Sequence, residues 1–179
     1  MKMLKGAVLV IFVAIVAGGG FVWSGAYNIG ADVPHWPVTK SILAITRNRS
    51  ISVHSSGIKV PNLNDPKLVA LGAGHYSEMC TGCHLAPDME KSELREGLYP
   101  KPPVLYKYGI HDPAKAFWIV KHGIKLTAMP AWGTSHSDHE IWAMVAFLKK
   151  LPQLSPAQYK AMTANAYDDD SDHAHRQDE

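Results

Sequence analysis

Two cysteines, the only two in this chain of 179 residues, lie three residues apart and are followed directly by a histidine, in the run Cys80-Thr81-Gly82-Cys83-His84. If both are used within this run, no disulfide can link distant parts of the chain. A closed zinc site would need a second pair of ligands at matching spacing. A thioredoxin-like dithiol would need a surrounding βαβ pattern. The sequence has no further cysteine and almost no strand signal, so neither alternative is favoured.

The order Cys-x-x-Cys-His is instead the pattern of covalent haem attachment. At the end of a helix, the two thiols reach the same edge of a flat ring, where they can form thioethers to the two haem vinyl groups. We therefore predict one haem c, bound covalently through Cys80 and Cys83, with His84 as an axial ligand of the iron.

For the second axial position we predict Met129, which lies in a turn-like segment directly before Pro130. A thioether ligand favours reduced iron and raises the reduction potential, and the proline would stiffen the loop that holds the sulfur. His111 and His122 are alternative ligands. The ordinary alternative role for a methionine is core packing.

Helix signals surround this motif, and they predict a small all-α domain over residues 65–155. Asp65, Asp112 and Ser137 each stand where a helix would begin, and Ser137 is followed by Glu140 in the pattern of a capping box. The predicted helices run from Asp65 to about Cys80, from Asp112 to His122, and from Ser137 to Leu151. Roughly 90 residues make a small core, to which a buried haem would add apolar mass.

The N-terminus predicts a membrane helix. Lys2 and Lys5 precede an apolar run of 18 residues, from Gly6 to Trp23, which as a helix is about 27 Å long. We predict a membrane anchor over residues 1–31, with its N-terminus in the cytoplasm and the rest of the chain outside. A cleaved signal peptide, processed near residues 24–26, is the alternative.

Two further segments flank the predicted domain. Residues 32–64 form an extracytoplasmic connector with a short helix within 35–49, either packed on the domain, lying in lipid headgroups or docking to a membrane partner. Residues 156–179 are predicted to be an acidic, disordered tail. Residues 166–179 hold six acids and one arginine, hence −5, which leaves +7 of the total of +2 on the rest. This nearly balanced total gives no reason to expect nucleic acid as a partner.

Over residues 65–152 the chain resembles the class I c-type cytochromes, in particular small membrane-anchored monohaem forms. In that family the first and last helices cross through a glycine–aromatic contact, and a proline before a Val-Leu pair gives its carbonyl to the axial histidine. Pro103 is the candidate for that proline. The resemblance rests on Gly72, Tyr76, the attachment motif, the stretch Tyr99-Pro100-Lys101-Pro102-Pro103, Met129-Pro130, Met144 and Phe147.

The resemblance implies a one-electron carrier of the respiratory chain on the periplasmic face of the membrane, rather than an enzyme. It would pass electrons from a quinol-oxidising complex or dehydrogenase to an oxidase or reductase, so the expected partners are membrane-bound redox proteins and the lipid bilayer. The alternatives are a dedicated subunit of a larger membrane redox enzyme, or a peroxidase-like or gas-binding haem protein. Lysines are expected to steer an acidic partner, namely Lys101, Lys107, Lys121 and Lys125.

Overall fold

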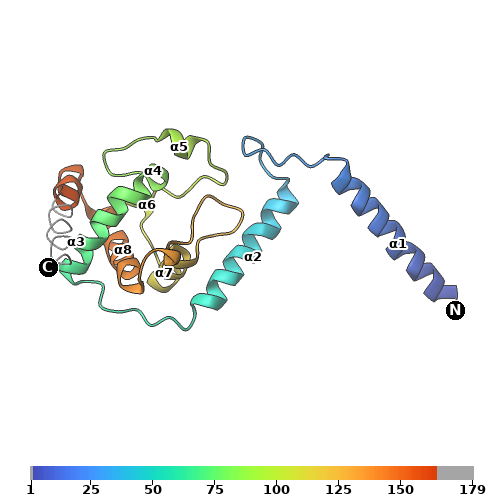
Figure 1. The fold of residues 1–179 in the computed structure, drawn as a ribbon, viewed down its shortest axis with the longest axis horizontal. Coiled ribbons are helices and arrows are strands. Elements are labelled where there is room, and N and C mark those ends of the chain that lie inside the picture. The colour runs from blue at the N-terminus through green and yellow to red at the C-terminus, as the bar shows by residue number, and fades with distance from the viewer. Residues whose placement is uncertain (1, 165–179) are drawn as a thin grey trace, which may run out of the picture. The chain divides into compact units, whose positions relative to one another are not determined.

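The computed structural model describes residues 2–164, which form helices and loops with no β-strand among them (Figure 1). The all-α prediction is therefore confirmed. The chain divides into two compact units, Met1–His35 and Trp36–Glu179. The helices are α1 (Lys2–Trp23), α2 (Pro37–Ser55), α3 (Pro66–His75), α4 (Thr81–His84), α5 (Glu93–Glu96), α6 (Leu105–Tyr108), α7 (Pro113–His122) and α8 (Asp138–Lys150).

Helix α1 dominates the first unit. It has 22 residues, and its most apolar window has a mean hydropathy of 2.3 with none of its side chains buried. By length and composition it is able to cross a membrane, and a signal sequence has the same properties. The predicted apolar helix is therefore present, and its character fits either an anchor or a signal.

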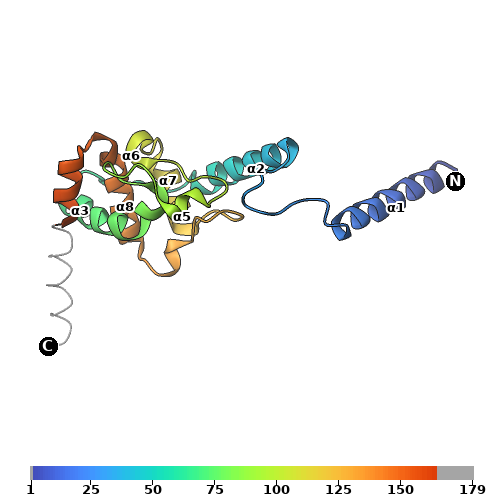
Figure 2. The same cartoon turned by 90° about the horizontal axis from the view of Figure 1, so that it is seen from above.

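The core of the second unit is built around the crossing of α3 and α8, which lie side by side in both views (Figures 1 and 2). At the crossing, a Cβ placed on Gly72 would lie only 1.9 Å from the carbonyl oxygen of Ala143, so only glycine lets the two backbones approach this closely. Beside it, the rings of Tyr76 and Phe147 pack with centroids 5.4 Å apart, and both are fully buried. The glycine–aromatic contact implied by the resemblance is thus present.

The predicted helix starts also carry their caps. The carboxylate of Asp65 accepts a hydrogen bond from the backbone N–H of Lys67, and Asp112 caps α7 in the same way. Ser137 and Glu140 form a reciprocal capping box at the start of α8. Each cap satisfies backbone N–H groups that the first helical turn leaves without a partner.

The connector is more ordered than its sequence suggested. Helix α2 extends from Pro37 to Ser55, beyond the predicted limit at residue 49. It packs on α7, where the rings of His54 and Trp118 are 5.7 Å apart, and its residues Ile51 and Ser55 are buried. Of the alternatives for this segment, packing on the domain is the one that the structure contains.

The predicted start of a disordered tail at residue 156 is wrong for residues 156–164, which form a helix. Ser155 and Gln158 cap this helix reciprocally, a box that the prediction overlooked. Tyr159 and Thr163, one turn apart, are buried on its inner face, with Tyr159 packed against the rings of Tyr76 and Phe147. The acidic remainder, 165–179, lies outside the described residues.

Replacing Gly72 with alanine tests the crossing. In an isolated helix this change would stabilise by about 1 kcal/mol. Here the added methyl group meets the backbone of Ala143, so we expect a net loss of about 1–3 kcal/mol in the free energy of unfolding, measured by chemical denaturation. Gly97→Ala is the matched control, because its Cβ would meet nothing closer than 3.8 Å. Equal stability of the two variants would contradict the tight contact.

Candidate haem-binding site

A cavity of about 490 Å³ lies within the second unit, and it brings together Cys80, Cys83, His84 and Met129. Its volume falls within the range of ligand and cofactor pockets. Much of its wall is aliphatic, from Leu105, Ile110, Ile119, Val120, Ile124 and Leu148. Two thiols, an imidazole and a thioether facing one apolar cavity are a donor set that fits a covalently attached haem.

The attachment motif follows directly on α3. Residues Tyr76–Cys80 form a single π-helical turn, a distortion that is frequent at functional sites, and α4 then carries the remainder of the motif. Burial, followed by the proximity of Cys83, raises the pKa of Cys80 to about 12. The two thiols of the motif are presented by the consecutive helical turns that follow α3.

The orientation of the His84 ring is determined by a hydrogen bond to the proline-rich stretch 99–103. Its Nδ1 lies 2.9 Å from the carbonyl oxygen of Pro103, and because a carbonyl only accepts, Nδ1 donates this hydrogen bond. The second ring nitrogen, Nε2, is then the one with a lone pair for a metal. Burial lowers the pKa of His84, the bond to Pro103 acts in the opposite direction, and the charge of Arg95 lowers it further. The ring is therefore neutral at pH 7, as a ligand must be.

Arg95 is a site residue that the sequence reasoning missed. Its Nη2 donates a hydrogen bond of 2.8 Å to the carbonyl of Pro102, and its side chain is only 14% exposed. Nearby, the hydroxyl of Ser92 donates to the carbonyl of Gly82 within the motif. The segment around α5 therefore ties the attachment motif to the stretch that holds His84. No local pattern signals this role, because it depends on contacts between loops.

Met129 lies at the end of a tight loop that begins after α7. Gly123 has a positive φ of 64°, and a Cβ there would lie 2.7 Å from the carbonyl oxygen of Met129. Within the loop, Thr127 donates through its hydroxyl to Ile124 and accepts from the N–H of Met129. The backbone of Met129 is thus held at its N–H by the hydroxyl of Thr127 and at its carbonyl by the N–H of Ile124, while its side chain lines the cavity.

The two rival histidines have different positions. His111 lines the cavity, whereas His122 is not among the lining residues and has its ring 5.0 Å from that of Trp118. Trp132, whose indole N–H could donate a hydrogen bond to a haem propionate, also lines the cavity. The structure therefore keeps His111 and Trp132 next to the site and separates His122 from it.

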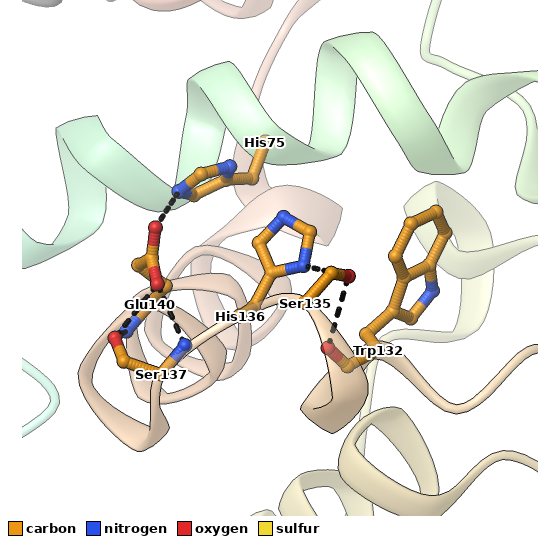
Figure 3. Close-up of polar contacts among 6 residues, drawn as sticks. All are labelled: His75, Trp132, Ser135, His136, Ser137 and Glu140. Atoms are coloured by element: carbon orange, nitrogen blue, oxygen red, sulfur yellow. Dashed lines mark hydrogen bonds and ion pairs between the residues drawn. The ribbon is translucent and has the colours of Figure 1, made fainter.

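A polar network supports the turn that carries Trp132 (Figure 3). The ring of His136 stands edge-on to Trp132 at 5.5 Å and to His75 at 5.3 Å, and Ser135 shares a hydrogen bond of 2.9 Å with His136. His75 also lies 3.9 Å from the carboxylate of Glu140. Hydrogen bonds from Ser137 lower the pKa of Glu140, which remains ionised at neutral pH. In residues 2–164, no group of His, Cys, Asp and Glu has the arrangement of a metal site.

The family comparison agrees with this geometry. Residues 67–148 match the family described as cytochrome c oxidase, cbb3-type, subunit III, a span that holds the attachment motif, Pro103, Met129 and most of α8. No curated protein and no solved structure matches the chain. This part of the chain is a c-type cytochrome domain, and that family implies covalently bound haem c.

Removing the side chain of Arg95 tests the support of the proline-rich stretch. Arg95→Ala leaves the carbonyl of Pro102 without its charged donor, so we expect a loss of about 1–3 kcal/mol in the free energy of unfolding, measured by thermal denaturation. Lys101→Ala is the control, because the side chain of Lys101 is 51% exposed and its ion pair with Glu96 is exposed to solvent. If Arg95→Ala is as stable as this control, the bond does not hold the segment.

Proposed function

We propose that this protein is a monohaem electron carrier, with one haem c held by thioethers from Cys80 and Cys83 and by axial bonds from His84 and Met129. The observation that carries the proposal is the convergence of these four side chains on one apolar cavity. The chain contains only these two cysteines, so it has one attachment motif and can bind one haem covalently.

The haem would supply the one-electron chemistry of iron, and the protein would set its potential. Pro103 would keep the imidazole of His84 in the tautomer that binds metal and would increase its basicity. A thioether from Met129 would favour the reduced state, as would an apolar wall that limits contact with water. These three properties suit transfer of electrons between proteins.

For the location, we propose that α1 anchors the protein with its N-terminus in the cytoplasm and the haem domain in the periplasm. Lys2 and Lys5 precede the apolar run, in keeping with the tendency of positive residues to remain inside. The 13 residues 24–36 join α1 to α2, and a chain of that length spans at most about 45 Å. The donor and acceptor would therefore be membrane-bound proteins, such as a quinol-oxidising complex and a terminal oxidase.

A second candidate function is that of a dedicated cytochrome subunit in a larger membrane oxidase. It is favoured by the family match, whose description names a subunit of a cbb3-type oxidase. In that case the partner contact would be permanent instead of brief, and the same haem would relay electrons within one complex.

The four lysines expected to steer a partner differ in their surroundings. Lys121 lies 2.5 Å from a carboxylate oxygen of Asp138, and Lys101 lies 2.7 Å from one of Glu96, so part of their charge is neutralised locally. Neither Lys107 nor Lys125 has such an ion pair among the described residues. Any electrostatic steering would therefore depend more on these two than on the paired lysines.

Covalent attachment is the first test of the proposal. When the purified full-length protein is denatured in acid and extracted with organic solvent, we expect the haem to remain with the polypeptide, because thioether bonds survive this treatment. Its reduced pyridine spectrum should be that of haem c, at one haem per chain. Haem that passes into the organic phase would contradict attachment through Cys80 and Cys83.

Met129→Ala tests the second axial ligand. Loss of the thioether should open the iron to carbon monoxide, remove the sulfur-to-iron charge-transfer band and lower the midpoint potential. Met162→Ala is the control, because Met162 packs against the core and does not line the cavity. If Met129→Ala keeps the spectrum of the unmodified protein while His111→Ala changes it, His111 is the ligand instead.

A further inference from the structure

We propose that Arg47, on helix α2, binds a propionate of the haem. The inference rests on the proposed function, because it takes the cavity to be the haem site. It concerns a residue outside the family match at residues 67–148 and outside the attachment motif. It gives the connector helix a part in binding the cofactor, in addition to linking the domain to its N-terminal segment.

The position of Arg47 follows from the way α2 packs. Ile51 and Ser55 are buried, and His54 contacts Trp118 of α7, so this face of α2 is fixed to the domain. Arg47 lies one helical turn before Ile51, on the same face. Although the residue as a whole is exposed, it lines the cavity.

The charges around the cavity single out Arg47. Lys101 and Lys115 also line it, but each already has a carboxylate partner, Glu96 at 2.7 Å and Asp112 at 3.6 Å. Arg47 has no ion pair among the described residues. Its Nε donates to the side-chain oxygen of Asn48 at 3.1 Å, which leaves the two terminal nitrogens of the guanidinium for an anion.

The chemistry of the haem supplies such an anion. Its vinyl groups would be tied to Cys80 and Cys83, and the propionates lie on the opposite edge of the porphyrin ring. They are the only acidic groups of the cofactor. The planar fork of an arginine matches a carboxylate in bidentate geometry, with hydrogen bonds that charge strengthens. Among the described residues, Arg47 is the cation on the cavity wall that lacks a carboxylate partner, and it is suited to this role.

The experiment compares Arg47→Gln, Arg47→Lys and Arg49→Gln in the full-length holoprotein, after covalent haem has been verified in each. Arg49 is the matched control, because it has the same charge on the same helix but does not line the cavity. Midpoint potentials come from spectroelectrochemical titration, and the propionate bending band comes from resonance Raman spectra. The Raman band reports the propionate contact itself, whereas the potential reports the charge beside the iron.

We expect Arg47→Gln to lower the potential, because a nearby positive charge disfavours the extra charge of the oxidised iron. It should also shift the propionate band. Arg47→Lys should keep most of the potential, because it keeps the charge, but should shift the band, because it loses the bidentate geometry. Arg49→Gln should change neither.

A propionate band that is unchanged in Arg47→Gln would overturn the inference, and so would equal effects of Arg47→Gln and Arg49→Gln on the potential. If Arg47→Gln does not mature, an unchanged band in Arg47→Lys overturns the inference in its place. These results are distinct from a failure of the proposed function. That failure would appear as an absence of covalent haem in the protein that carries no substitution.

Discussion

The backbone contact between Gly72 and Ala143 is the constraint on which the rest of the haem domain depends. Because no side chain separates α3 from α8 at this point, the two helices cross at close range, and Tyr76 and Phe147 pack beside the contact. The attachment motif continues directly from α3 through a π-helical turn. The crossing therefore determines where Cys80 enters the cavity, to which α8 also contributes Leu148.

The two side chains proposed as axial ligands, His84 and Met129, are restrained by loops and not by the long helices. His84 depends on the carbonyl of Pro103, and the neighbouring carbonyl of Pro102 is in turn held by Arg95. Met129 depends on a loop closed by Gly123 and Thr127. Loops are the usual carriers of functional residues, provided that a rigid scaffold positions them. Here the helix crossing is that scaffold.

The features that could be predicted from the sequence are those with a local signal. The Cys-x-x-Cys-His run and the caps of α3, α7 and α8 each depend on residues within a few positions of one another, whereas the contact of Gly72 with the distant Ala143 was expected only from the family resemblance. Arg95 gave no such signal, because its partner Pro102 lies across a loop. The full length of α2 was missed because its last turn is stabilised by burial of Ile51 and Ser55 against the domain. The helix at 156–164 did have a local signal, the Ser155–Gln158 capping box, which the acidic composition that follows it obscured.

Segments outside the family match also support the candidate site. Tyr76 provides the clearest example. Its hydroxyl donates a hydrogen bond of 2.6 Å to the carbonyl of Leu85, and its burial raises the pKa of the hydroxyl, which stays protonated. Leu85 follows His84 directly and has a φ of 64°, a conformation that costs a leucine energy and persists only when the surroundings impose it.

Tyr159, from the helix after the matched region, packs on Tyr76 and keeps it in place. The backbone beyond His84 is thus held by Tyr76, which a residue near the C-terminal end of the described chain supports, while α2 contributes Arg47 to the wall of the cavity. In this protein the matched domain and its flanking helices form one structural unit around the haem site.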